Sequence, residues 1–272
     1  MMLNKGIEGH GNPTPEMPKG DKAPVAKTPP KKGPGMTAAW LPPQLQNLPA
    51  VQAKGKGKAK IVAWGGDNSN TQFALLALWA ARRHGIYTDP GLLAAYDRFE
   101  MSQNADGGWG YHMNNGSTKT MTCVGLLGEA MGHGVSPEVV AVDPNNPKRK
   151  IFKHVLEDPK VHKGLTALSK HIGEPSLDEN KKNYQLENLY LLWSVERVAM
   201  LYDLKYINGK DWYGWGAQML VHTQDNSGAW PTCHHYHGMN APLNTCFALL
   251  FLRRSNLVQD LTENLRLHSA IE

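Results

Sequence analysis

The chain has 272 residues, 41% of them hydrophobic, which is enough for one sizeable buried core. Its net charge of +5 comes from the first 60 residues, which hold ten Lys and three acidic residues, whereas the remainder holds 19 basic and 21 acidic residues. The near-neutral remainder argues against specific nucleic-acid binding. Three cysteines exclude a dense disulfide framework.

The first segment is rich in Pro and Lys, because ten of the 18 prolines lie within it. Such a composition buries too little apolar surface to offset chain entropy. The sequence therefore predicts a disordered arm over residues 1–62 and a folded domain over residues 63–272. Neither a signal peptide nor a run of about 18 apolar residues is present, which excludes a transmembrane segment in this chain and favours a cytoplasmic protein.

After the arm, apolar runs alternate with amphipathic ones, which predicts an all-α domain. Gly85 can end the first run, and Thr88-Asp89-Pro90 and Asp158-Pro159 can start later helices. The polar runs 142–150 and 174–182 are expected to be loops. We predict apolar inner helices near 71–84, 119–132, 186–203 and 243–255, and amphipathic outer helices near 90–103, 159–172 and 210–224.

Two outer helices are followed by the same motif, Q-x-x-x-G-x-W, at residues 103–109 and 224–230. The inner helices repeat as well, since NTQFALL at 70–76 differs from NTCFALL at 244–250 at one position. Looser copies lie at 121–127 and 188–197. Self-similarity of this kind is typical of repeat architectures. The motif residues are Gln103, Gly107, Trp109, Gln224, Gly228 and Trp230.

This pattern resembles the repeat of squalene-hopene and oxidosqualene cyclases, whose relatives include protein prenyltransferase β subunits. The resemblance covers about residues 64–268 and implies αα-hairpins of an (α/α) toroid. Toroids of this family close with five to seven hairpins, so this chain is expected to be incomplete, either truncated or closed by another chain. In the motif, we expect the Gln amide to bind backbone groups, the Trp ring to cover it and the glycines to permit the turn. These residues are therefore assigned to stability.

The family's catalytic groups are missing. Its cyclases use an Asp in a D-x-D-D or D-C-T-A motif as proton donor, and neither motif occurs in the chain. Its prenyltransferases hold zinc through a His before a Thr-Cys pair, where this sequence has Asn244. Asn244 and Asn70 are instead predicted to be helix N-caps.

A carbocation path needs an aromatic-lined pocket. The inner helices offer Phe73, Trp79, Tyr190, Trp193 and Phe247, which could equally be plain core. Glu196 and Arg197 lie in an apolar run, where a charge must be paired or face a cavity. Glu187, Asp203 and Asp211 are candidate partners, and a buried structural ion pair is favoured over a catalytic acid.

One predicted loop contains residues of the types that bind metal ions. Residues 232–237 read TCHHYH, so Cys233, His234 and His237 are candidate zinc ligands. Adjacent Cys-His ligands also occur in the lanthionine cyclases, another α/α toroid, but those need a distant second Cys, here Cys123 or Cys246. We favour a surface loop and expect no cofactor, with zinc as the alternative.

Three functional classes remain. The resemblance implies a protein that acts on an isoprenoid or another apolar ligand. The missing catalytic groups favour a non-catalytic binding or scaffold toroid, with an oligomer or further N-terminal repeats as partners. A carbohydrate-active barrel is disfavoured because it needs two facing carboxylates.

Overall fold

The computed structural model describes Pro43 and residues 66–136, 139–142, 145, 150–152, 154–175, 188–231 and 240–267. The arm predicted over residues 1–62 and the candidate zinc ligands Cys233, His234 and His237 lie outside these residues. Eight α-helices account for most of the described part: α3 (Asn68–Arg83), α4 (Asp89–Ser102), α5 (Lys119–Val135), α6 (Pro159–Ser169), α7 (Leu189–Leu201), α8 (Trp212–Thr223), α9 (Ala241–Arg253) and α10 (Gln259–Leu267).

The all-α class is confirmed, and the seven predicted helices correspond to α3 to α9 with shifts of a few residues at their ends. Three short elements and helix α10 were not predicted. Strands β1 (Val139–Val142) and β2 (Lys150–Phe152) pair antiparallel, so the run expected to be a loop begins and ends in a strand. The 3₁₀ helix η2 (Val155–Glu157) precedes α6.

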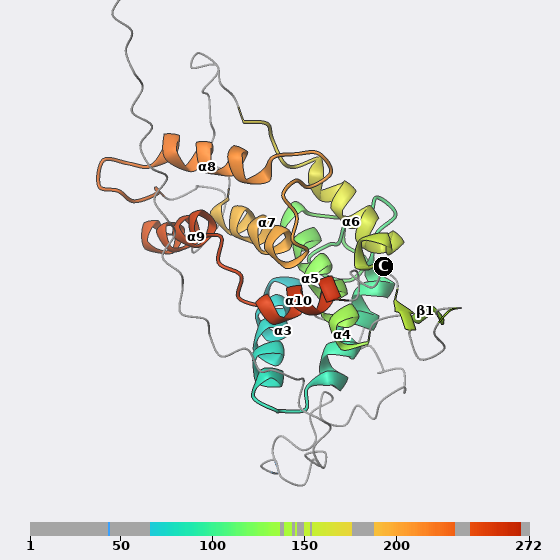
Figure 1. Cartoon of the computed structure of the whole chain (residues 1–272). Coiled ribbons are helices and arrows are strands. Elements are labelled where there is room, and N and C mark those ends of the chain that lie inside the picture. Colours follow the sequence, from blue (N-terminus) through green and yellow to red (C-terminus); the bar gives the residue numbers. More distant parts are fainter. Residues whose placement is uncertain are drawn as a thin grey trace, which may run out of the picture.

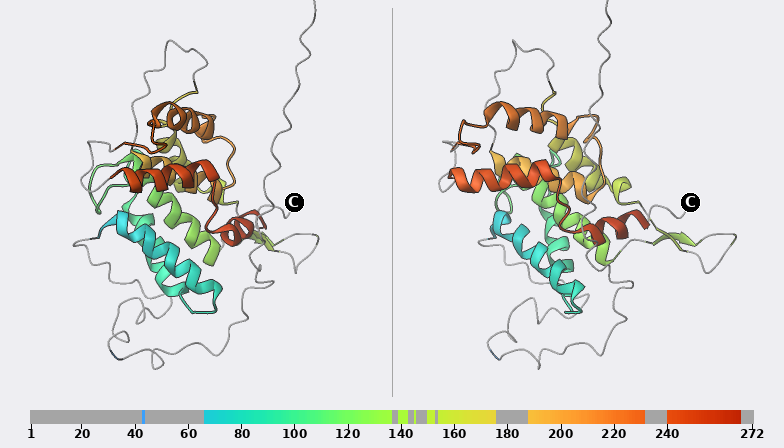
Figure 2. Two further views of the ribbon diagram at one scale, coloured as in Figure 1. Left: turned by 90° about the vertical axis from the view of Figure 1, so that its left-hand side faces the viewer. Right: turned by 60° about the vertical axis from the view of Figure 1, so that its left-hand side comes forward.

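The apolar helices α3, α5, α7 and α9 contact one another in succession. The amphipathic helices α4 and α6 pack on α5, and α8 packs on α7 (Figure 1). Helices α3 and α4 therefore stand at one end of the array, while α8 and α9 stand at the other (Figures 1 and 2). The two central inner helices, α5 and α7, are apolar because other helices surround them on most sides.

The core is built where outer helices meet inner ones. Its largest fully buried side chains include Trp79, Phe99 and Trp109. Two glycines of α5 permit a close approach, since an added Cβ would lie 2.1 Å from a ring atom of Trp109 at Gly125 and 2.1 Å from one of Phe99 at Gly128. Atoms that close cannot coexist, so both positions require glycine for this packing.

The helix caps correct one prediction. Asp67 caps α3 and Asn240 caps α9, each through a side-chain oxygen that accepts a backbone N–H. Asn70 lies inside α3, where its amide donates to Asp67 Oδ2 over 2.8 Å. Asn244 is buried inside α9 and donates to the carbonyl of Pro231 over 2.7 Å. The caps lie three and four residues earlier than predicted, which places Asn70 and Asn244 inside the helices.

Helix α10 packs against α5 and α7 and is joined to α3, because the indole of Trp79 donates to Asp260 Oδ2 over 2.9 Å. The sequence pattern that would predict α10 is short, because it consists of Leu261 and Leu265, one turn apart in a polar run. Within the part of the chain that the structure describes, no helix is long and apolar enough to cross a membrane.

Candidate functional site

Both copies of the repeat motif form the same turn. The amide of Gln103 donates to the carbonyl of Gly107 over 2.9 Å, and that of Gln224 donates to Gly228 over 2.8 Å. Gly107 and Gly228 have φ values of 90° and 83°, a left-handed conformation that suits glycine. In each copy, the Gln side chain thus binds the backbone of its own motif and closes the turn that follows the outer helix.

The two motif tryptophans also have matching contacts. The indole of Trp109 donates to the carbonyl of Phe99 over 2.9 Å, and that of Trp230 donates to Leu220 over 3.0 Å. Their backbone N–H groups bind the hydroxyls of Thr122 and Thr245, at 3.3 and 3.4 Å, in the inner helix that follows. Each Trp therefore links its outer helix to the next inner one.

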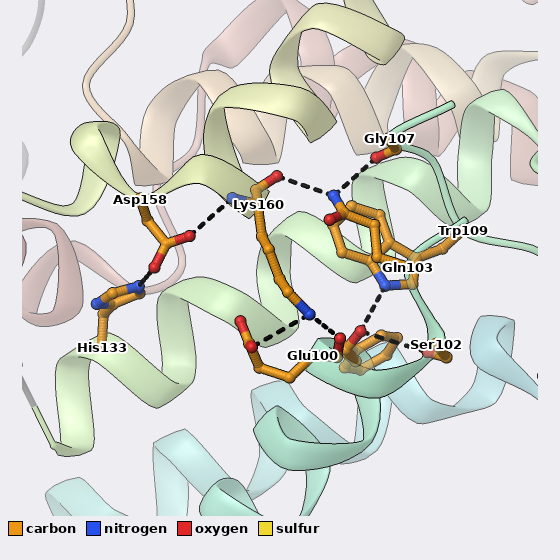
Figure 3. Close-up of polar contacts among 9 residues, drawn as sticks. Glu100, Ser102, Gln103, Gly107, Trp109, His133, Asp158 and Lys160 are labelled. Carbon is orange, nitrogen blue, oxygen red and sulfur yellow. Dashed lines mark hydrogen bonds and ion pairs between the residues drawn. The ribbon is translucent and has the colours of Figure 1, made fainter. Parts of the chain in front are cut away.

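The first motif has one further contact, shown in Figure 3. Gln103 Nε2 also donates to the carbonyl of Lys160 over 2.9 Å, at the start of α6. This bond ties the end of one outer helix to the beginning of the next. Gln224 precedes no further outer helix in the described chain, and Gly228 is its one acceptor there.

Four aromatic side chains from three inner helices meet in an aromatic cluster, formed by Phe73 of α3, Tyr190 and Trp193 of α7 and Phe247 of α9. The ring centroid of Trp193 lies 5.8 Å from that of Phe73 and 5.0 Å from that of Phe247. Tyr190 lies 5.8 Å from Phe247. Phe73 is 48% exposed, whereas Trp193 is buried, so the cluster extends from the surface into the core.

Arg197 lies against the buried end of this cluster. Its guanidinium carbon is 3.8 Å from the ring centroid of Trp193, within the range of a cation–π interaction. Its Nη2 donates to Gln72 Oε1 and, over 3.2 Å, to the hydroxyl of Ser194. Burial lowers the pKa of Arg197 to about 10, so the side chain is still charged at neutral pH.

A buried ion pair was predicted for Glu196 or Arg197, with Glu187, Asp203 and Asp211 as candidate partners. Neither Asp203 nor Asp211 pairs with Arg197 in the structure. Asp203 pairs with Arg266 at 2.5 Å, and Asp211 caps α8 by accepting from Gly214 over 2.8 Å. Glu187, the third candidate partner, lies outside the described residues.

Two of the predicted cavity-lining residues lie elsewhere. Trp79 is fully buried and bound to α10 through Asp260, so it takes no part in the aromatic cluster. Glu196 is fully buried with both carboxyl oxygens unpartnered. Burial raises its pKa to about 8, and so the side chain is largely neutral near pH 7.

A second polar group, between α4, α5 and α6, was not found from the sequence. Figure 3 shows Lys160 next to Glu100 and Asp158 next to His133. Lys160 Nζ lies 3.2 Å from Glu100 Oε2, and His133 Nε2 lies 3.3 Å from Asp158 Oδ2. Glu129 of α5 is fully buried beside them, and burial together with the Glu100 carboxylate raises its pKa to about 9. These residues come from three helices, and no spacing in the sequence brings them together.

No set of three His, Cys, Asp or Glu residues that could hold a metal occurs within the ranges that the structure describes. The loop with Cys233, His234 and His237 is outside them, so its lack of zinc stays a prediction. Cys123, a candidate second ligand, is buried in α5, and burial raises the pKa of its thiol to about 12.

No protein-family model, curated protein sequence or solved structure matches this chain. The candidate site is therefore argued from its geometry. Of the two polar groups, the one at Arg197 combines a buried charge with an aromatic surface that reaches solvent.

Proposed function

We propose that this chain is an incomplete α/α-toroid repeat domain of the cyclase and prenyltransferase type. Two features support the repeat arrangement. The motif residues make equivalent hydrogen bonds in both copies, and the inner helices contact one another in succession. Equivalent contacts at equivalent positions are what duplicated hairpins retain.

The proposed function is the binding of an apolar, isoprenoid-like ligand on the aromatic cluster. The observation that carries it is the meeting of Phe73, Tyr190, Trp193 and Phe247 at one place, with Phe73 half exposed. Aromatic side chains that reach the surface together supply a large apolar contact area. The sequence lacks the D-x-D-D and D-C-T-A motifs, so binding without cyclisation is the function we favour.

Farnesol, a neutral C15 isoprenoid alcohol, tests this function by isothermal titration with the full chain. We expect Phe73→Ala to weaken binding about tenfold, because it removes apolar contact area from the exposed edge of the cluster. Tyr87→Ala is the matched control, since Tyr87 is 57% exposed and follows the end of α3. Failure of farnesol to bind, or an equal loss in both variants, would rule out the aromatic cluster as the site.

A second candidate is a scaffold that associates with other repeats. It is favoured by the end helix α9, which buries only Asn244, Ala248 and Phe251 while Leu243 and Leu249 are 39% and 56% exposed. Sedimentation velocity separates the candidates. A stable oligomer without farnesol binding would favour the scaffold.

A further inference from the structure

Several buried hydrogen-bond donors at the aromatic cluster lack acceptors. Arg197 is 8% exposed, yet its Nε and Nη1 atoms have no partner in the described structure. The same holds for Nε2 of Gln72, which is fully buried, and for the hydroxyl oxygen of Tyr190. Buried donors are normally satisfied, so this group calls for an acceptor.

The positive charge of Arg197 is also uncompensated. Its hydrogen-bonded partners, Gln72 and Ser194, are both neutral. Cys123, Tyr190 and Glu196 are near enough to interact electrostatically, but burial raises the pKa of the first two to about 12 and that of Glu196 to about 8, so all three are mainly neutral near pH 7. An unpaired buried charge is costly, and a ligand that neutralised it would gain affinity.

We infer that Arg197, Gln72 and Tyr190 bind the carboxylate of an apolar ligand whose chain lies on the aromatic cluster. The inference rests on the proposed function and names the head group of the ligand. Each donor fork of a guanidinium includes Nη2, and Nη2 of Arg197 already donates to Gln72 and Ser194. A carboxylate would therefore accept single charge-assisted hydrogen bonds from Nε or Nη1, with Gln72 Nε2 and the Tyr190 hydroxyl as further donors.

The charges nearby favour a single negative charge over a diphosphate. Arg82 pairs with Asp89 at 2.7 Å, and Arg83 lies 3.7 Å from Asp260, so both cations already have carboxylate partners. Arg197 is thus the one buried cation at the cluster in the described residues. It also borders a small cavity with Leu76, Leu127, Met200 and Leu257, which has room for about one water molecule and is not lined by the aromatic cluster.

Three probes with the same C15 chain test the head group: farnesol, farnesoic acid and farnesyl diphosphate. We expect farnesoate to bind about tenfold more tightly than farnesol to the full chain near neutral pH, and the diphosphate to bind no more tightly than farnesoate. Acetate, which has the carboxylate without the chain, is expected not to displace farnesoate.

Variants then locate the carboxylate. Arg197→Gln should abolish the preference for farnesoate while farnesol affinity stays within about threefold, and Tyr190→Phe, which keeps the ring, should reduce the preference about threefold. The matched control is Arg254→Gln, because Arg254 also lies over aromatic rings, 5.1 Å from that of Tyr213, but is exposed. This control should bind all three probes like the unaltered chain.

The outcomes separate this inference from the proposed function. Farnesol binding with no preference for farnesoate would overturn the carboxylate site and leave the apolar site standing, whereas no binding of any probe would overturn both. Tightest binding by the diphosphate, or displacement by acetate, would refute the ligand class.

Discussion

Glu129 changes how the stability of the protein depends on pH. Its pKa lies near 9 in the folded chain, because of burial and the neighbouring Glu100, against an ordinary value of 4.5 for a glutamate. Between these two values the folded state retains a proton that the unfolded state has released. The contribution of Glu129 to the stability is therefore largest below about pH 4.5. It decreases as the pH rises from there to about 9, and it levels off above that. Glu196, with a pKa of about 8, acts in the same direction.

Glu129→Gln tests this linkage. Glutamine keeps the shape of the neutral acid and cannot ionise, so the fall in unfolding free energy between pH 5 and pH 9 should be smaller. At pH 9 the variant should be more stable than the unaltered chain by on the order of 2 kcal/mol. Urea denaturation at several pH values measures it, with the exposed Glu157→Gln as control. Parallel pH profiles for Glu129→Gln and the unaltered chain would contradict the shifted pKa.

At the scale of elements, the sequence predicted most of the helices because their signals are local. Apolar runs and turn residues such as Gly85 mark α3 to α9 within a few residues. The caps of α3 and α9, helix α10 and the β1–β2 pair were missed, since each depends on contacts made in the folded chain. The aromatic cluster was predicted in part: four of its five proposed aromatic residues meet, whereas Trp79 bonds to α10. Among the unpartnered donors, Arg197 and Tyr190 were singled out from the sequence, whereas Gln72 had no sequence signal.

The two motif glutamines should differ in their effect on stability. Gln103→Ala removes donors from two backbone carbonyls, those of Gly107 and Lys160, whereas Gln224→Ala removes one from Gly228. We expect the first variant to lose about 1 kcal/mol more unfolding free energy than the second. Chemical denaturation of both variants makes each the control for the other. Equal losses would show that the link to α6 adds no stability.

Considered as a whole, the molecule has a well-buried centre and open ends. Helix α5 buries 14 of its 17 residues and α7 buries 11 of 13, whereas α3 buries four of 16 and α9 three of 13. In an array of this kind, each hairpin is stabilised mainly by its neighbours. The end helices, which have fewer neighbours, should open first.

Amide hydrogen exchange, followed by mass spectrometry, tests that order. Peptides from α5 and α7 are expected to exchange slowest, at rates set by global unfolding, and those from α3 and α9 faster, because their local opening breaks fewer apolar contacts. The unaltered chain needs no variant for this comparison. If α9 were protected as strongly as α5, the array would unfold as one unit and the nearest-neighbour description would fail.

The bond from Gln103 to Lys160 also bears on the curvature of the array. It fixes the spacing of two consecutive outer helices at their ends, while the inner helices are held at their own spacing by side-chain packing. The ratio of these two spacings sets how sharply successive hairpins turn. Gln224 makes the same hydrogen bond within its motif as Gln103, and its amide is exposed. It would therefore donate to the first turn of an outer helix placed after α9, as Gln103 donates to α6. A hairpin inserted after α9 would thus meet the same side-chain donor at Gln224 that Gln103 offers to the start of α6.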